Sequence, residues 1–424
     1  MQWCQSSFDN QSQARKTYSS AMREKNFVVR HFNARALKSA LFSGLCRFPG
    51  ARAFLNYYQD AESFEVAAEP GSVRSRVVRP ARDYGVSFRD DELRDLLRCR
   101  REDAEGLAVT FKMARIRDVT VLGAAGVMLS NRSGKVLHLD GASPRMHRNW
   151  VVARPLAPTQ GAADATYINL LGVRQGHRHF AHFFWDAMVP FMVYLKEWHD
   201  PAERIVCLVR EDLSAIQRDT FRFIEEDWPG IRFQPLSGRC KIVCPNAVYL
   251  AYQNRNHGVD NVMARDDLRV LADLYVKHYG VAVEGGAGAR RIYVSRQSAQ
   301  LRRPKNEAAL SDMLKGLGFE AHDPGRLPFR EQVALFSSAG VIVAPHGAAL
   351  ANLMFCRPGA RVLEFFPRNY SNPCYAMMCR AMGLEYRYLF GGRGNAPKLG
   401  FVMDPDKLRA AVEEMTAAAA AGRR

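Results

Sequence analysis

Apolar and polar residues follow one another in two different ways along this chain, and the change comes near residue 164. Between residues 111 and 150, short β-rich runs are separated by Gly, Asn and Ser, which predicts a small antiparallel meander. From about residue 164, apolar runs of strand length alternate with longer runs of helical periodicity. Repeated alternation of strand and helix with short connections is typical of a parallel, doubly wound sheet.

The alternating region divides in two at a short Gly-rich stretch, residues 280–289, which is typical of a linker between domains. Before the linker, we expect strands at 167–171, 204–209, 231–235 and 240–251 and helices at 180–198, 214–227 and 261–279. After it, we expect strands at 291–295, 319–322, 340–344 and 361–366 and helices at 306–317, 328–338 and near 346–355. The pattern therefore predicts an α/β protein with two Rossmann-like domains in series and a ligand at the carboxyl ends of their strands, in the cleft between them.

Composition narrows the function classes without naming one. With 47% hydrophobic and 24% charged residues over 424 positions, the chain has ample apolar mass for more than one folded domain. No apolar run approaches the ~18 residues of a membrane-spanning helix, and we expect no secretory signal at the start. The net charge of +17 favours an anionic partner: nucleic acid, an acidic membrane or a phosphorylated substrate.

The nine cysteines are scattered, and none stands in a Cys-x-x-Cys pair. Cys240 and Cys244 are four residues apart, but no second pair follows at the spacing of a zinc site. We therefore expect reduced, mostly buried thiols in a cytoplasmic protein.

The first candidate site follows the strand predicted at 340–344. His346 stands at the strand tip, and Gly347 with Ala348 would let backbone N–H groups approach an anion at the start of a helix. The alternative is a tight turn that the histidine caps. No Gly-x-Gly-x-x-Gly sequence occurs, so a dinucleotide fingerprint is not supported.

The second candidate site is the basic loop after the strand predicted at 291–295. Arg296 and Arg303 could both bind a diphosphate through their planar guanidinium groups. Asn306 and Glu307 stand at a predicted helix start, where capping is the ordinary role of such residues. The alternative for the arginines is a charged surface loop.

The third candidate is a histidine cluster, His177, His179 and His182, followed by Asp186. His182 and Asp186 are four residues apart and therefore share one helix face, as a general base and its carboxylate partner would. Zinc binding is a rival interpretation. A further interpretation is that this segment is part of an aromatic core, in which the histidine already has its hydrogen-bond partners.

Two further carboxylate positions are ambiguous. Glu364 ends an apolar strand, where a charge needs a partner, and it could hold ribose hydroxyls or form a structural salt bridge. Asp404 and Asp406 have the Asp-x-Asp spacing of a metal–diphosphate motif. Their place just before a predicted helix favours an N-cap instead.

Taken in this order, these segments resemble glycosyltransferase family 61, which includes bacterial capsular-polysaccharide proteins and some eukaryotic xylosyl- and N-acetylglucosaminyltransferases. The resemblance covers about residues 115–390. It is carried by His-Phe-x-x-Asp-x-x-x-Pro at 182–190, Arg-x-x-Ala-x-x-Arg-Arg-x-x-Asn-Glu at 296–307, His-Gly-Ala-x-x-x-Asn at 346–352 and Leu-Glu at 363–364.

The resemblance implies a GT-B-like architecture, in which two Rossmann-like domains face a cleft. Residues 1–110 would be a helical or irregular extension, 111–280 a β-meander with the acceptor domain, and 290–424 the nucleotide-sugar-binding domain. It further implies inverting, metal-independent transfer of a sugar from a nucleotide-sugar to a glycan acceptor, in capsular or cell-surface polysaccharide synthesis. No cofactor besides the donor substrate is expected, and no nucleic-acid partner.

The resemblance also assigns candidate roles within the site. The base would be His182, Asp186 or His346. Donor-binding residues would be Arg296, Arg303, Asn306, Glu307, His346, Gly347, Ala348, Asn352 and Glu364. We expect a cytoplasmic enzyme, in peripheral contact with the inner membrane if its acceptor is lipid-linked. Two alternatives stay open: a nucleic-acid-binding protein, suggested by the charge, and a zinc hydrolase built on the histidine cluster.

Overall fold

The computed structural model describes residues 61–78, 109–123, 126–138, 156–171, 179–254, 265–282, 290–395 and 400–421. Most of these lie in one compact unit, Glu62–Ala142 together with Pro158–Arg424. A second unit comprises Met1–Ala61 and Ser143–Ala157, and of it only residues 61, 156 and 157 are described. The predicted 1–110 extension and the middle of the predicted linker therefore fall largely outside the described residues.

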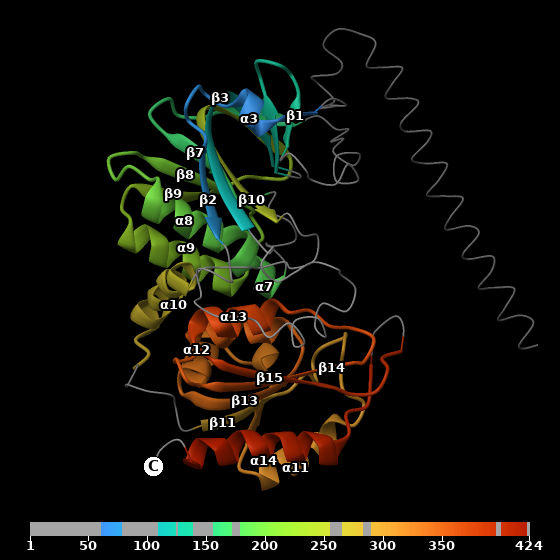
Figure 1. Ribbon diagram of the computed structural model, residues 1–424. Helices are drawn as coiled ribbons and strands as arrows, with labels where there is room; N and C mark the ends of the chain where they lie inside the picture. The colour runs from blue at the N-terminus through green and yellow to red at the C-terminus, as the bar shows by residue number, and fades with distance from the viewer. Residues whose placement is uncertain are drawn as a thin grey trace, which may run out of the picture. The chain divides into compact units, whose positions relative to one another are not determined.

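Two β-sheets organise the larger unit (Figure 1). The strands of the first are β1 (Ala61–Ser63), β2 (Arg74–Val78), β3 (Val109–Leu122), β4 (Val127–Ser130), β5 (Val136–His138), β6 (Ala157–Gln160), β7 (Thr166–Asn169), β8 (Ile205–Val209), β9 (Ile231–Pro235) and β10 (Cys240–Asn254). Their order is β1-β5-β4-β3-β10-β7-β8-β9, with β2 paired to β3 and β6 to β10.

The long strand β10 joins the predicted meander to the predicted Rossmann-like strands. It pairs antiparallel with β3, from Lys241 opposite Leu122 to Asn254 opposite Val109. On its other side it pairs in parallel with β7, which is followed by β8 and β9 in parallel register. The meander strands expected near 119–139 are present, but they form one sheet with the alternating region. Both β3 and β10 are longer than predicted because each gives the other's backbone its hydrogen-bond partners.

Helices α8 (Val189–Glu197) and α9 (Ala215–Asp227) pack against this sheet, and α10 (Arg265–Tyr279) packs against both of them. The start of α9 follows from its sequence. The Ser214 hydroxyl accepts from the Gln217 N–H at 3.3 Å, and the Gln217 side chain accepts from the Ser214 N–H at 2.9 Å. This reciprocal capping box satisfies two donors that a helix start would otherwise leave unpaired.

The second sheet is entirely parallel, with the order β12-β11-β13-β14-β15. Its strands are β11 (Arg290–Val294), β12 (Glu320–His322), β13 (Ala339–Pro345), β14 (Arg361–Phe366) and β15 (Glu385–Phe390). Figure 1 shows α11 (Glu307–Gly316) and α14 (Pro405–Ala421) on one face of this sheet and α12 (Phe329–Ser337) and α13 (Cys374–Met382) on the other. A parallel sheet with helices on both faces confirms the predicted α/β class.

The strands of this sheet divide their side chains between two apolar cores. Tyr293 and Val343 pack with α11 and α14, whereas their chain neighbours Ile292 and Ile342 pack with α12 and α13. Such alternation follows from the period of two along a strand. It also explains why these strands read as continuously apolar, since both faces are covered.

Aromatic residues link the helices of the two sheets. Phe329 of α12 lies 5.7 Å from Phe184 and 5.0 Å from Tyr275 of α10, between ring centroids. Tyr275 in turn lies 5.9 Å from Phe355. All four residues belong to one buried apolar cluster, so a single core continues from one sheet to the other.

Two predicted helices differ from expectation. The helix expected at 180–198 begins with one turn, α7 (Phe180–His182), then forms a π-helical segment, η2 (Phe183–Met188), before α8. The helix expected near 346–355 is a 3₁₀ helix, η4 (Ala348–Phe355). Short elements also occur at α3 (Phe64–Ala67) and η3 (Pro324–Arg326).

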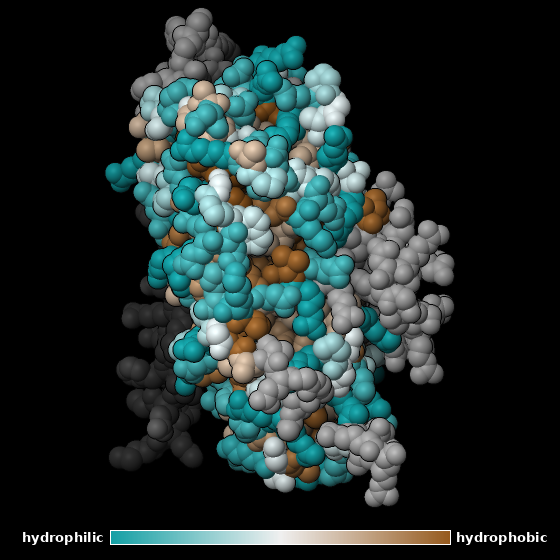
Figure 2. Space-filling model, turned by 90° about the vertical axis from the view of Figure 1, so that its left-hand side faces the viewer, coloured by the Kyte–Doolittle hydropathy of each residue, from teal (hydrophilic) through white to brown (hydrophobic). Residues whose placement is uncertain are grey.

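Hydrophilic side chains dominate the face shown in Figure 2, with apolar side chains visible in small patches between them. Among the described residues, no helix is both long and apolar enough to cross a membrane.

Candidate active site

Three loops meet at the carboxyl edge of the parallel sheet. They follow β11, β13 and β14, which are neighbours in the sheet order. Arg296 lies two residues after β11, and His346 directly follows β13. Ligands of such sheets bind at this edge because successive loops converge there.

The His346 imidazole forms a buried dyad with Glu364 of β14. Its Nδ1 lies 2.6 Å from Glu364 Oε1, and the Tyr386 hydroxyl donates to Glu364 Oε2 at 2.6 Å. Glu364 is fully buried, so these two contacts occupy both of its oxygens. That Glu364 also holds the ribose stays a prediction, because each carboxylate oxygen can accept a second hydrogen bond. We assign Glu364 to orienting His346: a carboxylate at Nδ1 fixes the tautomer that leaves Nε2 as the basic nitrogen.

Aromatic side chains and two cations surround the His346 ring. The ring centroids of Tyr370 and Tyr375 lie 5.4 and 5.3 Å from that of His346, and the Tyr370 hydroxyl lies 3.5 Å from Nε2. Burial lowers the pKa of His346, Glu364 opposes this shift, and the positive charges of Arg302 and Arg296 add to it. His346 is therefore neutral in the ligand-free protein at neutral pH.

Arg296 lies directly against Gly347. A Cβ atom added to Gly347 would stand 1.4 Å from Arg296 Nη1, so only glycine leaves space for the guanidinium. Arg296 Nη2 donates to the carbonyl of Leu301 at 2.8 Å, while its buried Nε has no hydrogen-bond partner among the residues that the structure describes. Burial lowers the pKa of Arg296, and the nearby Arg302 lowers it further. An anion bound here would relieve both effects.

Arg302 approaches the same place from the other end of its loop. Its guanidinium carbon lies 4.8 Å from the Tyr370 ring centroid, and its Nε donates to the His346 carbonyl at 3.5 Å. Its φ of 53° is rare for a residue with a side chain, and such backbone conformations concentrate at functional sites. Arg296 and Arg302 thus lie at the two ends of one loop. Within the described residues, no carboxylate lies within ion-pair distance of either.

A second histidine dyad comes from the first half of the chain. His182 Nδ1 lies 2.9 Å from Asp186 Oδ2, with the His182 side chain 29% exposed and Asp186 4%. The π-helical segment places Asp186 here, and such segments are frequent at functional sites. The His179 ring lies 4.6 Å from that of His182. Burial lowers the pKa of His179, followed by the charges of His182 and Arg302.

Ring contacts connect the two dyads. Trp185 of the π-helical segment lies 5.4 Å from Tyr375, which lies 5.3 Å from His346. Helix α7 packs against η4, directly after the His346–Gly347 turn. The positive charge of Arg302 lowers the pKa values of both His179 and His346, so Arg302 lies near both histidines. The structure thus places a partly exposed histidine dyad near a buried one, with two arginines beside the buried dyad.

Residues 180–363 match the family model described as Glycosyltransferase 61. The chain carries a glycosyltransferase 61 domain. The resemblance found in the sequence is thereby confirmed, and the protein is a glycosyltransferase enzyme that acts on a sugar donor and an acceptor. The matched range begins at α7 and includes both dyads' histidines and the two arginines. No curated protein matches the chain.

Four predicted donor-binding residues of the glycosyltransferase lie apart from this group. The Arg303 side chain is 53% exposed and lies 3.5 Å from Glu307, Nε to Oε2. Glu307 is buried and its Oε1 accepts from Ser295 Oγ at 2.9 Å and from the Arg296 N–H at 2.6 Å. It therefore holds the loop that carries Arg296.

The two asparagines are equally structural. Asn306 exchanges hydrogen bonds with the backbone of Met403, 2.6 Å to its carbonyl and 3.1 Å from its N–H. Asn352 is fully buried and donates to Gln332 Oε1 at 2.9 Å and to the Ala349 carbonyl at 3.0 Å. Asn352 thus secures the 3₁₀ helix that follows the glycine turn. The His346 N–H, also expected to face an anion, instead donates to the Phe365 carbonyl at 3.0 Å.

The sequence interpretation missed Arg302, Tyr370, Tyr375 and Trp185. The signal for Arg302 was present, since it is one of two consecutive arginines in the family segment, but sequence does not tell which of two neighbours points inward. The tyrosines follow β14 in a region without a chemical motif. Only the fold places them beside His346.

Metal ligation has little support in the described part of the chain. No group of three or more His, Cys, Asp or Glu residues there could hold a metal ion. The zinc interpretation also involved His177, which lies outside the described residues. The Asp404 carboxylate accepts from the N–H groups of Asp406 at 2.9 Å and Lys407 at 3.3 Å, which confirms its predicted role as the N-cap of α14.

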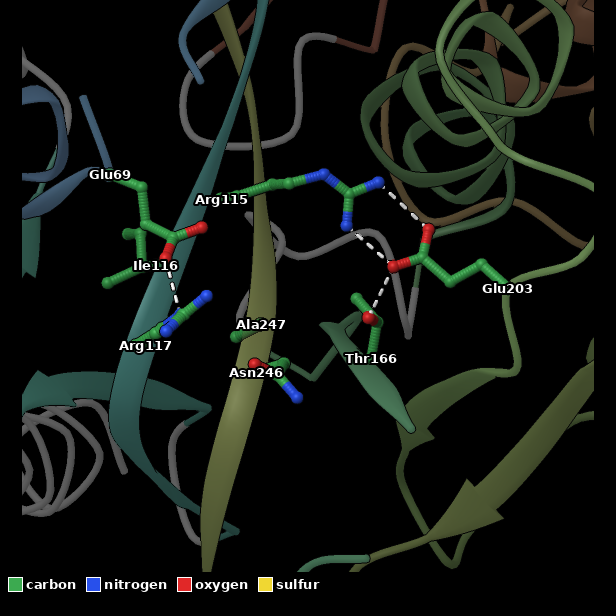
Figure 3. Close-up of a pocket in the computed structure, with 8 residues that line it drawn as sticks. All are labelled: Glu69, Arg115, Ile116, Arg117, Thr166, Glu203, Asn246 and Ala247. Atoms are coloured by element: carbon green, nitrogen blue, oxygen red, sulfur yellow. Dashed lines mark hydrogen bonds and ion pairs between the residues drawn. The ribbon is translucent and has the colours of Figure 1, made fainter. Parts of the chain in front are cut away.

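A separate pocket of about 220 Å³ lies in the first sheet, at the amino-terminal ends of β7 and β8 (Figure 3). Arg115 forks onto Glu203 there, at 2.5 and 2.9 Å, and Thr166 also donates to Glu203. Burial alone would raise the pKa of Glu203, but these hydrogen bonds outweigh it and hold the pKa below its ordinary value. Because its charges are paired with one another, we interpret this pocket as a structural junction of β3, β7 and β8.

Proposed function

We propose that this glycosyltransferase moves a sugar, with inversion and without a metal ion, from a nucleotide-sugar to a saccharide acceptor. One observation carries the proposal: Arg296 and Arg302 converge on the His346–Gly347 turn, and neither has a carboxylate partner in the part of the chain that the structure describes. Two guanidiniums at the carboxyl edge of a parallel sheet, of which that of Arg296 is desolvated, suit the diphosphate of such a donor.

The arginines would act on the leaving group. When the bond between the anomeric carbon and the diphosphate oxygen breaks, its electron pair stays on that oxygen. The developing negative charge would be stabilised by Arg296 and Arg302, whose positions are already fixed by Gly347 and Tyr370. Preorganised cations of this kind fulfil the task that a divalent metal performs in other transferases.

The His182–Asp186 dyad would act on the acceptor. Asp186 fixes the His182 tautomer with Nδ1–H toward the carboxylate, so that Nε2 is the basic position. As the acceptor oxygen bonds to the anomeric carbon from the face opposite the diphosphate, its proton would pass to His182 Nε2. Attack opposite the leaving group inverts the anomeric centre. We propose His182 as base rather than His346 because His182 is the more exposed of the two.

The wider context is proposed on the same basis. Strand–helix halves on either side of the two dyads suit a GT-B-like division, with donor binding in residues 290–424 and acceptor binding in 111–280. The net charge of +17 would favour an acidic, lipid-linked acceptor and peripheral attachment to the cytoplasmic face of the inner membrane. Capsular or cell-surface polysaccharide synthesis would use such a reaction.

Adjacent arginines provide the test. Purified wild-type protein is screened against nucleotide-sugars for thermal stabilisation without added metal, because a ligand of the native state raises its melting temperature. Using the donor that binds, Arg302→Ala should weaken binding roughly tenfold to 150-fold, the ~1.5–3 kcal/mol expected of hydrogen bonds to a charged group. Arg303→Ala, the matched control, should bind as wild type does. Equal losses at the two positions, or binding by none of the nucleotide-sugars, would refute the proposal.

A further inference from the structure

The buried dyad poses a chemical problem for donor binding. His346 Nδ1–H donates to Glu364, so in the ligand-free protein Nε2 carries a lone pair and accepts hydrogen bonds. Phosphate oxygens also only accept. A diphosphate held by Arg296 and Arg302 would therefore bring one acceptor toward another at Nε2.

A proton on Nε2 removes this conflict. We propose that His346 takes up a proton at Nε2 when the donor diphosphate binds between Arg296 and Arg302, and that the resulting imidazolium donates a hydrogen bond to the leaving phosphate oxygen. This inference rests on the proposed function, and it adds a third cation to the leaving-group site. The proton comes from solvent during binding, before any bond to the sugar is broken.

The position of Nε2 supports the proposal. The Tyr370 hydroxyl lies 3.5 Å from Nε2, and the guanidinium of Arg302 lies 4.8 Å from the centre of the same tyrosine ring. Arg302 Nε also contacts the carbonyl of His346 itself. Nε2 and the Arg302 guanidinium thus both lie against Tyr370, so a phosphate that binds Arg302 would lie near Nε2.

The dyad is built to carry the extra charge. Glu364 is fully buried, at 2.6 Å from Nδ1, and Tyr386 donates to its second oxygen. A carboxylate with both oxygens engaged stabilises an imidazolium without moving. In the ligand-free protein this attraction is opposed by burial and by both arginines, which lower the pKa of His346. The two negative charges of a bound diphosphate would offset the arginines.

Six charged or titratable groups of the described residues face His346 and enter this balance. Arg296 and Arg302 belong to the loop after β11. Glu364 belongs to β14, and Tyr386 of β15 donates to it. Tyr370 lies in the segment after β14, and Tyr375 lies in α13. Burial raises the pKa values of the three tyrosines, so they stay neutral near pH 7. The donor is therefore the component that changes the net charge around His346.

Calorimetry measures the proton directly. Nucleotide-sugars are suitable probes because their diphosphate is esterified at both ends and does not titrate near neutral pH. UDP-glucose, GDP-mannose and dTDP-glucose are titrated into the full-length protein in buffers of different ionisation enthalpy at one pH. For the sugar nucleotide that binds, the slope of binding enthalpy against buffer enthalpy should show uptake of about one proton, and affinity should fall by up to tenfold per pH unit above neutral.

Variants locate the proton. His346→Asn keeps a donor toward Glu364 but cannot titrate, so its uptake should fall to near zero. His322→Asn is the matched control on the far edge strand β12, where His322 pairs with Glu320 at 3.3 Å, and it should keep full uptake. His179→Asn should also keep it, although Arg302 affects this residue too.

Glu364→Gln gives an independent check if His346→Asn fails to fold. Its amide can donate to His346 Nδ1, which moves the imidazole proton to Nε2, so donor binding should persist without proton uptake. Binding by wild type without proton uptake, or undiminished uptake in His346→Asn or Glu364→Gln, would overturn this inference while leaving the proposed function intact. Binding of no nucleotide-sugar would remove both.

Discussion

Gly347 allows the sharpest test of how the arginine site is built. Its φ of 179° is extended backbone that any residue adopts, so Gly347→Ala introduces no backbone strain. The added Cβ would stand 1.4 Å from Arg296 Nη1, whereas ordinary contact begins at 3.4 Å. The guanidinium must therefore move by about 2 Å, which exceeds the tolerance of a charged hydrogen bond.

The expected cost follows from the contacts that are displaced. Hydrogen bonds to a charged group contribute ~1.5–3 kcal/mol, so donor affinity should fall roughly tenfold to 150-fold. Arg296→Ala should cause a similar loss. The double variant should lose little more than either single variant, because both changes remove the same interaction. Donor dissociation constants from calorimetry, with melting temperatures alongside, give the measurement.

Gly316 is the matched control. It is the last residue of α11, and an added Cβ would meet nothing within 4 Å among the described residues. Gly316→Ala should therefore leave donor affinity unchanged. Wild-type affinity in Gly347→Ala would show that Arg296 has no part in donor binding at this turn.

Three further predictions concern other parts of the chain. Asp186→Asn should keep donor affinity but lower turnover by about 10²–10⁴-fold, because His182 loses the carboxylate that makes it a base; steady-state kinetics with unchanged turnover would contradict this. Ser214→Ala should lower stability by ~1 kcal/mol through loss of the capping box, as thermal unfolding would detect. The pKa of Glu203 is depressed in the folded protein, so its stabilising contribution is present above the unfolded-state pKa and is lost as pH falls through the folded-state pKa. Melting temperatures measured from neutral pH downward should therefore show a shallower acid decline in Glu203→Gln than in the wild type, and parallel curves would argue against it.

Much of the fold follows from local pattern. The second sheet was predictable because strands buried on both faces read as largely apolar runs, as 340–344 does, and short loops leave few ways to connect them. The joining of the meander to the first sheet was not predictable. It depends on pairing between β3 and β10, which are more than a hundred residues apart. β15, whose sequence has mixed polarity, and α13 were also not placed.

The site shows the same division between local and long-range information. His182 and Asp186 could be paired from sequence because helical spacing puts them on one face. The partnership of His346 with Glu364 could not, since it requires adjacent parallel strands in a particular register, Ala344 opposite Glu364. Likewise, Arg302 rather than Arg303 faces the site because one backbone torsion is positive, which no pattern of residue types specifies.

The aromatic cluster shared by the two sheets has a consequence for how the protein unfolds. Phe329, Phe184, Tyr275 and Phe355 contribute to the cores of both halves at once, so neither half can lose its packing without exposing large apolar rings of the other. Heating should therefore melt the two sheets in a single cooperative transition. A fragment ending at the predicted linker should be insoluble by itself, however complete its own strands are.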